Sequence, residues 1–155
     1  MMPAPAFKTP VGSSATLGDV RFDSKIAIVV RGDLPTWQRL NLTAFLASAV
    51  AGGHPETIGE PYEDGSGNGY LAMFRQPVLV FEASAAELRT TWERAAAREL
   101  STAVFTDELF VTGNDADNRA AVAAVPADKL ALAGLGLYGP RNAVDKVVKG
   151  LALHP

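Results

Sequence analysis

The chain has 155 residues, a net charge of −3 at pH 7 and no cysteine. This length predicts one domain with a real core, and the lack of cysteine excludes disulfides, thiolate metal sites and a cysteine nucleophile. The negative net charge makes RNA a disfavoured partner, because nucleic acids are bound by positive potential. The sequence has neither an apolar run that could span a membrane nor the apolar core of a secretory signal. We therefore expect a cytoplasmic protein that needs no membrane.

The first part of the chain changes from a polar leader to a strand and a helix. Residues 1–20 are rich in proline, glycine, serine and threonine, which predicts a flexible leader. Residues 25–31 (KIAIVVR) predict a strand that is apolar enough to be central, and a turn follows at 32–35. Residues 36–51 predict a helix whose only charge is Arg39. A helix that is apolar all round is usually covered on both sides, so we expect a second layer or, in a homodimer, a subunit partner on its outer side.

A small hairpin is predicted at residues 60–74. The turn-forming stretch EDGSGNG, residues 63–69, is flanked by Tyr62 and by the apolar residues 70–73. Turn residues between two such flanks are typical of an irregular hairpin. The glycines lack the lysine and the serine or threonine that a phosphate-binding P-loop needs, so we expect no phosphate site in this hairpin.

The second half of the chain alternates strands and helices. A capping box of Ser84 and Glu87 predicts the start of one helix, and Asn114 or Asp115 caps a short helix further on. The elements after the hairpin are predicted as strand 78–81, helix 84–99, strand 101–106, short helix 114–125, strand 130–138 and helix 139–150. This alternation predicts a single α/β domain over residues 21–155, with a mixed, mostly parallel sheet of four strands, helices on both faces and the inserted hairpin.

Three glycines in the last predicted strand imitate a dinucleotide-binding motif. Gly134, Gly136 and Gly139 have the G-x-G-x-x-G spacing, but they lie inside the strand and not in a turn after it. The motif also needs an acidic ribose-binding residue about 20 positions on, and Pro155 is the last residue. We therefore expect no cofactor, and we interpret Gly134 and Gly136 as positions where a neighbouring element packs closely.

Two stretches of the chain resemble type II peptidyl-tRNA hydrolases. KIAIVVRGDL, residues 25–34, is similar to their opening strand, and GLGLYGPRNAVDKVVKGLAL, residues 134–153, is similar to their closing stretch. The strand before Asp107 can be matched to their third strand, with Asp107 as its aspartate. Nearly everything after Lys25, including RQPVLVF at residues 75–81, is closer to an uncharacterised bacterial family, domain of unknown function 2000. The resemblance implies the hydrolase fold and brings no established activity with it.

The chain departs from the hydrolases where their chemistry lies. Their first helix carries a catalytic lysine and a catalytic glutamine, and the matching positions here are Leu40 and Ala44. A shift by one residue would offer Arg39 and Thr43, but an arginine stays charged and is a poor proton donor or acceptor. Asp107 is retained, although the residues that follow it differ from those of the family. We therefore expect the fold without the peptidyl-tRNA hydrolase activity.

Polar residues at strand ends and helix starts are the candidates for a site, because such residues meet at one edge of an α/β sheet. Asp107 and Asn41 are candidate catalytic residues; the alternatives are a solvated carboxylate for Asp107 and a local backbone hydrogen bond for Asn41. The candidate substrate-binding residues are Arg31, Asp33, Thr43, Thr106, Arg141 and Asn142. The last two begin the final helix, where free amides can hold an anion. His54 and His154 have no visible partner, so we expect no metal site and no catalytic triad.

Three functions are compatible with these residues. We favour a protein of unknown function that binds a small ligand or a partner on a hydrolase-like scaffold, without peptidyl-tRNA hydrolase activity. The first alternative is a hydrolase of an ester or amide bond, in which Asp107 orients water and Asn41 or Thr43 assists; a pocket joining Asp107 to Asn41 would favour it. The second alternative is noncatalytic RNA binding, which would need a basic surface formed by Arg39, Arg141, Lys146 and Lys149.

Overall fold

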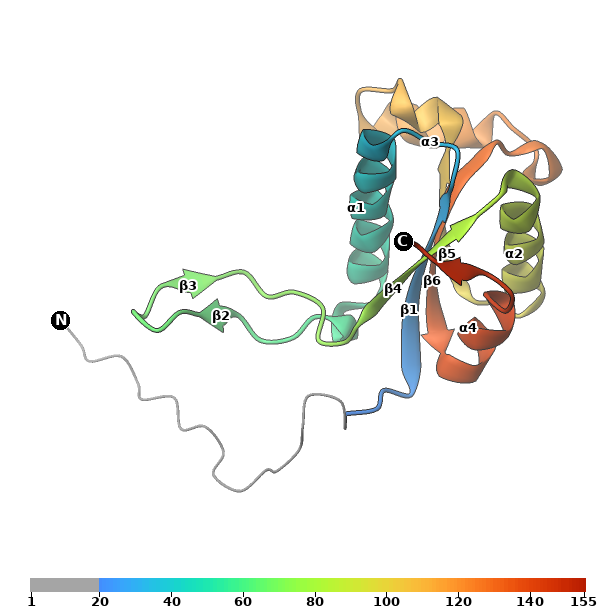
Figure 1. Cartoon of the computed structure of the whole chain (residues 1–155). Coiled ribbons are helices and arrows are strands. Elements are labelled where there is room, and N and C mark those ends of the chain that lie inside the picture. The colour runs from blue at the N-terminus through green and yellow to red at the C-terminus, as the bar shows by residue number, and fades with distance from the viewer. Residues whose placement is uncertain (1–19) are drawn as a thin grey trace.

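The computed structural model describes residues 20–155, in which five strands form one sheet (Figure 1). Across the sheet the strands are β5 (Ser101–Thr106), β6 (Leu132–Pro140), β1 (Ser24–Arg31), β4 (Val78–Ala83) and β7 (Ala152–Leu153). Within it the β1–β4 pair is parallel, whereas β6 runs antiparallel to both β5 and β1, and β7 runs antiparallel to β4. The predicted leader, residues 1–20, lies outside the described residues except for Val20.

The sheet is mixed, as predicted, but the prediction of four strands that are mostly parallel is wrong, because five strands form the sheet and only β1 and β4 pair in parallel. The missed strand, β7, has two residues, and so short a strand leaves no periodic pattern in the sequence. The segment between β5 and β6 crosses one end of the sheet instead of a face (Figure 1). Its elements are η2 (Asp107–Phe110), α3 (Asp115–Ala123) and η3 (Ala127–Lys129). The chain consequently re-enters the sheet at the edge that it left, which makes β6 antiparallel to β5.

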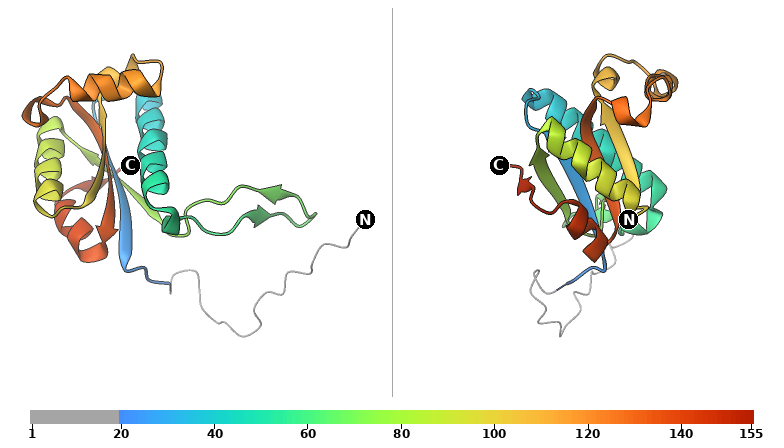
Figure 2. Two further views of the ribbon diagram at one scale, coloured as in Figure 1. Left: turned by 180° about the vertical axis from the view of Figure 1, so that it is seen from behind. Right: turned by 90° about the vertical axis from the view of Figure 1, so that its right-hand side faces the viewer.

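Helices cover both faces of the sheet, as predicted (Figure 2). Their bounds are Thr36–Gly53 for α1, Ala85–Ala97 for α2 and Arg141–Val147 for α4. α1 packs on one face against β1, β5 and β6, while α2 and α4 pack on the other face. The result is one α/β domain of three layers. No helix within residues 20–155 has both the length and the apolar character to cross a lipid bilayer.

The central strand β1 supplies side chains to both cores. Ile28 and Val30 point toward α1, and Val29 points toward α2 and α4, because successive side chains of a strand alternate between faces. All three side chains are buried. This explains why residues 26–30 read as a continuous apolar run instead of an alternating pattern.

α1 approaches β6 closely because β6 presents glycines beneath the helix. A Cβ atom added at Gly134 would lie 2.7 Å from Leu42 Cδ1, and one at Gly136 would lie 3.3 Å from Leu46 Cβ. Leu42 and Leu46 are buried by this contact. The prediction that these glycines allow close packing is confirmed.

The capping residues predicted from the sequence start two helices. The Ser84 hydroxyl accepts a hydrogen bond from the Glu87 amide at 3.1 Å, and the Glu87 carboxylate accepts one from the Ser84 amide at 3.0 Å, which starts α2. The Asn114 side chain accepts a hydrogen bond from the Asp117 amide at 2.9 Å and starts α3. The helix predicted from residue 139 begins only at Arg141, because Pro140 still pairs with β1 and is the N-cap of α4.

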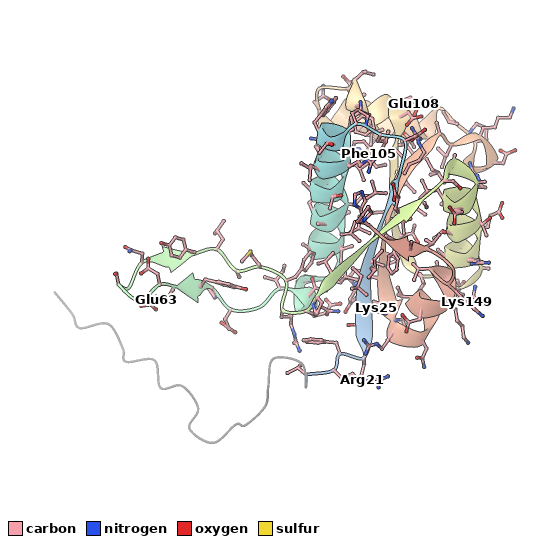
Figure 3. All side chains as sticks on the ribbon, viewed as in Figure 1. Arg21, Lys25, Glu63, Phe105, Glu108 and Lys149 are labelled. Atoms are coloured by element: carbon pink, nitrogen blue, oxygen red, sulfur yellow. The ribbon has the colours of Figure 1, made fainter. Side chains whose placement is uncertain are left out.

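The predicted hairpin is present and projects away from the sheet on the side of α1 (Figures 1 and 2). It follows η1 (Pro55–Thr57) and contains the antiparallel strands β2 (Tyr62–Glu63) and β3 (Gly69–Tyr70). We name residues 58–74 the arm. A bridge between Ile58 and Phe74 closes its base, and Figure 3 shows Glu63 on the arm, far from Phe105 in the body.

A network around Asp64 orders the turn of the arm. The Asp64 carboxylate accepts hydrogen bonds from Asn68 Nδ2 at 2.9 Å and from the Tyr70 hydroxyl at 2.7 Å. It also accepts backbone N–H groups of Ser66 and Asn68. These donors lower the pKa of Asp64 well below its usual range, and the bond to Asp64 raises the pKa of Tyr70.

Candidate functional site

The carboxyl ends of β1, β4 and β5 lie at one edge of the sheet, which we name the strand-end edge. β1 and β4 are parallel neighbours, yet α1 follows β1 on one face and α2 follows β4 on the other face. In α/β proteins the helices diverge in this way at the topological switch point, where a crevice forms outside the strand ends. The fold therefore places a crevice between β1 and β4.

An open pocket of about 600 Å³ occupies this position, and we name it the strand-end pocket. Its polar lining comes from three places: the turn after β1, the end of β4 and the first turn of α2. Its charged and polar lining side chains are those of Arg31, Asp33, Glu82, Ser84 and Glu87. Gly150 and Ala152, before and within β7, close the pocket on the remaining side.

Arg31 is held in place from three directions. Its Nε donates to Asp33 Oδ1 at 2.6 Å, its Nη2 lies 2.9 Å from Asp107 Oδ1, and its Nη1 donates to the Leu132 carbonyl at 2.8 Å. The side chain is 14% exposed. Burial lowers the pKa of Arg31, but the bonds to Asp33 and Asp107 outweigh burial and raise the pKa above its ordinary value. Arg31 is thus a fixed positive charge that joins the ends of β1, β5 and β6.

A second guanidinium, that of Arg39 in α1, braces the other side of the pocket. Its Nε donates to the Leu34 carbonyl at 2.7 Å, and its Nη2 donates to the Gly32 carbonyl. Its Nη1 lies 3.7 Å from Glu82 Oε1 and 3.1 Å from His154 Nε2. A Cβ atom added at Gly32 would overlap the Glu82 carboxylate, so Glu82 lies directly over the turn after β1.

His154 links the C-terminal segment to the pocket. Its Nε2 lies 3.1 Å from Nη1 of Arg39, and its Nδ1 lies 3.0 Å from the Pro155 carbonyl oxygen. The imidazole thus contacts the same guanidinium group that lies beside Glu82.

Carboxylates outnumber positive charges around the strand-end pocket. Asp33, Glu82 and Glu87 line it, and Asp107 lies behind Arg31. Asp33 and Asp107 pair with Arg31, Glu82 lies beside Arg39, and Glu87 caps α2, so four carboxylates and two guanidinium groups give a net charge of −2. Both guanidinium groups are engaged by carboxylates and carbonyl oxygens. A net negative charge attracts cations and repels phosphate.

Four of the predicted site residues meet at the strand-end edge. Arg31, Asp33 and Asp107 form the ion-pair cluster. Thr106, at the end of β5, is buried, and its hydroxyl has no hydrogen-bond partner among the described residues. Of these four, Arg31 and Asp33 line the pocket directly, and Asp107 reaches it through Arg31.

The other four predicted site residues lie elsewhere. Arg141 and Asn142 follow Pro140, which pairs with Ser24 at the start of β1, so they lie at the opposite edge; Figure 3 shows Lys25 at that edge and Glu108 near the strand-end edge. Asn41 is exposed on α1. Thr43 Oγ1 donates to the carbonyl of Arg39 at 2.7 Å, a bond within α1.

Aromatic rings fill the surface between α1 and the end of β5, where the hydrolase comparison placed a polar site. The ring centroids of Trp37 and Phe110 lie 5.8 Å apart, those of Phe45 and Phe105 5.7 Å, and those of Phe105 and Phe110 4.8 Å. Asn41 lies between Trp37 and Phe45 on the helix. Apolar rings thus separate it from the polar cluster around Asp107.

A second depression, of about 420 Å³, lies at the C-terminal end of α1 and is lined by His54, Ser101, Thr102 and Tyr138, among others. His54 Nδ1 lies 3.1 Å from Glu56 Oε1, and the His54 ring centroid lies 4.4 Å from that of Tyr138. The sequence analysis named no partner for His54, although Glu56 follows two residues later in the stretch H-P-E and could have been expected to pair with it. In residues 20–155 no group of three or more histidine, aspartate or glutamate side chains is placed to hold a metal ion.

Sequence reasoning missed Glu82, Arg39 and His154 as parts of one site. Glu82 had a signal, because a carboxylate in the otherwise apolar strand β4 needs a partner. Arg39 and His154 had none, since their contact joins residues 115 positions apart.

Comparison with known proteins gives a family without an activity. The model of a family described as "Protein of unknown function (DUF2000)" matches residues 24–155. A solved structure, that of the protein of unknown function Atu0240 from Agrobacterium tumefaciens strain C58, is 41% identical to this chain with a TM-score of 0.84. The similarity covers 87% of this chain and 100% of the other chain. No curated protein matches this chain. The chain therefore belongs to the family of proteins of unknown function DUF2000.

Proposed function

We propose that the protein binds a small organic cation, such as an amine or a guanidinium compound, in the strand-end pocket. The observation that carries this proposal is the excess of carboxylates around a pocket at the switch point of the fold. A volume of about 600 Å³ suits a small molecule. Glu82 lies at the centre of the proposal, because it belongs to β4, lines the pocket and lies 3.7 Å from Arg39 Nη1.

We propose further that the fold is related to that of type II peptidyl-tRNA hydrolases and that their activity is absent. The order of strands and helices supports the relation. The positions matched to the catalytic lysine and glutamine, Leu40 and Ala44, are exposed apolar residues that cannot transfer a proton. The retained aspartate, Asp107, is held by Arg31 at 2.9 Å. These features favour binding over hydrolysis.

The same geometry weighs against both alternative functions. The hydrolase hypothesis needs Asp107 and Asn41 in one pocket, and neither residue lines the two pockets described above. The RNA hypothesis needs Arg39 and Arg141 on one basic surface. Arg39 is turned toward carbonyl oxygens at the strand-end edge, whereas Arg141 lies at the opposite edge.

Calorimetric titration with agmatine, putrescine and argininamide tests the binding proposal. We expect saturable binding by the native protein, weakened roughly tenfold or more in Glu82→Gln, because removal of one carboxylate takes away about 1.4 kcal/mol of attraction. Glu93→Gln, at an exposed position of α2, is the matched control and leaves binding unchanged. Absence of saturable binding with all three cations, or tighter binding of inorganic phosphate, would sink the proposal.

A second assay tests the absence of hydrolase activity. Purified protein mixed with an N-acyl-aminoacyl-tRNA is expected to release no free tRNA above the rate without protein. Cleavage that disappears in Asp107→Asn would show that the chemistry has survived without the lysine, and the noncatalytic proposal would be wrong.

A further inference from the structure

The arm, residues 58–74, leaves the body of the protein without packing on it (Figure 1). Its base is fixed by the Ile58–Phe74 bridge and by a hydrogen bond from the Gly59 amide to the Met73 carbonyl at 2.9 Å. Beyond the base, β2 and β3 pair with each other alone within the described part of the chain. A lone two-stranded ribbon is marginal in water, so such an arm gains stability from a surface that covers it.

The side chains of the arm are suited to burial against another surface. Tyr62, Tyr70, Leu71 and Met73 are large, apolar or aromatic, and exposed, with Leu71 reaching 90% exposure. Large apolar side chains gathered on one projecting element mark a protein interaction surface.

The outer face of α1 is a second exposed apolar surface on the same side of the molecule (Figure 2). Trp37, Leu40 and Phe45 are exposed there, and Ala44 lies between them. α1 has one charged side chain, Arg39, and its guanidinium is turned inward to the Gly32 and Leu34 carbonyls. The outer face of α1 is therefore uncharged, and its apolar side chains surround the polar but neutral residues Asn41 and Ser48.

We infer that these two surfaces join two copies of this chain in a twofold dimer, with each arm lying against α1 of its partner. Figure 1 shows the arm starting near the C-terminal end of α1 and running outward, so the arm and α1 form a corner that a second copy can enter. In a twofold dimer the same contact occurs twice, since the arm of each copy meets α1 of the other copy.

The exposed area is sufficient for a stable dimer. The seven large side chains of the two surfaces, Trp37, Leu40, Phe45, Tyr62, Tyr70, Leu71 and Met73, are between 49% and 90% exposed. At about 200 Å² for a whole large side chain, they expose on the order of 800 Å² per protomer. Each partner in a standard protein interface buries about 800 Å². The side chains are those of an interface centre, aromatic and uncharged, which fits a second copy of the same surface.

The test is the oligomeric state of the full chain, measured by light scattering on a size-exclusion column over a wide range of protein concentration. We expect a dimer for the native protein. Ala44→Glu on α1 and Leu71→Glu on the arm each raise the dimer dissociation constant by roughly a factor of ten or more, because each buries an unpaired charge. Ala96→Glu makes the same change at an exposed position of α2 on the opposite face and leaves the dimer intact. Unchanged circular dichroism shows that each variant folds.

A cross-linking experiment locates the contact. The chain has no cysteine, so Leu40→Cys and Leu71→Cys proteins can each be labelled at one site. We expect a bifunctional thiol reagent to join the two proteins when they are mixed. A monomeric native protein, a dimer that survives both Ala44→Glu and Leu71→Glu, or a dimer that Ala96→Glu disrupts equally would each overturn the inference.

Discussion

The strand-end pocket and the arm are both open to solvent, but they are built in opposite ways. Charged side chains from several elements form the pocket, and its two guanidinium groups are held by ion pairs and carbonyl oxygens. The arm is a ribbon of two strands that presents apolar side chains and is ordered by its own turn. Polar groups fixed by several contacts suit a small charged ligand, whereas an apolar ribbon suits a protein surface.

α1 connects the two regions, because its faces serve different purposes. The inner face carries Leu42 and Leu46, which are buried against β6. Arg39, near its start, braces the pocket, while Leu40 points to solvent on the outer face. One helix therefore packs one face on the core and leaves the other face, which we propose as an interface, open to solvent.

The largest effect is expected from Leu46→Ala. Leu46 is 1% exposed and lies over Gly136, so the change leaves a cavity and lowers the free energy of unfolding by about 2–5 kcal/mol. Urea unfolding measures this loss. Leu40→Ala, on the outer face of the same helix, is the control and changes the unfolding free energy of the monomer by less than about 0.5 kcal/mol. Equal losses in the two variants would contradict the assignment of the two faces.

Arg31→Met is expected to have the next largest effect. The change leaves Asp33 and Asp107 without their shared partner and removes the donor to the Leu132 carbonyl. We expect a loss of about 2 kcal/mol in unfolding free energy, reduced from the value for a fully buried pair because both aspartates are partly exposed. Arg98→Met removes an exposed arginine at the end of α2 and is the control. A stability equal to that of the native protein would show that Arg31 does not brace the strand-end edge.

The turn of the arm should depend on pH. The pKa of Asp64 is lowered in the folded protein by hydrogen bonds from Asn68 and Tyr70 and from backbone N–H groups. A lowered folded pKa means that the stabilisation is present above the unfolded pKa of about 4 and is lost as the pH falls through the folded value. The protection factor of the Tyr70 amide, which corrects for the intrinsic pH dependence of exchange, is expected to fall in acid at a pH where the amides of β1 stay protected. Asp64→Asn should exchange faster at neutral pH and lose this acid dependence.

The smallest effect is expected from Leu71→Ala. Leu71 is 90% exposed in the arm, so truncation changes the unfolding free energy of the monomer by less than about 0.5 kcal/mol. Thermal melts at low protein concentration measure this change. Together with Arg31→Met, this variant separates the two regions, since Arg31 is held by contacts within one chain whereas the Leu71 side chain is exposed. A large loss of unfolding free energy in the dilute monomer would mean that the arm stabilises the rest of its own chain.

Much of the fold could be predicted from the sequence, because local signals carry it. The Ser84–Glu87 capping box, the Asn114 cap and the apolar run of β1 all lie within a few residues of what they determine. The direction of β6 could not be predicted, since it depends on the path of α3 across the end of the sheet. The two-residue strand β7 was too short to leave a pattern.

Part of the candidate site could be predicted, because that part too depends on residues close together in the sequence. Arg31 and Asp33 are two residues apart and follow a strand, so their meeting could be predicted. Asp107 reaches them because β1 and β5 both run antiparallel to β6, which brings their carboxyl ends to one edge. Glu82 joins the pocket through pairing of β4 with β1, a contact that depends on the whole sheet.

The most direct test of the proposed function is a nuclear magnetic resonance titration of the native protein with agmatine, followed at the backbone amides. We expect saturable shifts at Gly32, Asp33, Glu82 and Ser84 around the strand-end pocket, and none at Tyr62 and Tyr70 in the arm. Shifts confined to the arm or to the outer face of α1, or a spectrum that agmatine leaves unchanged, would contradict a cation site at the strand-end edge.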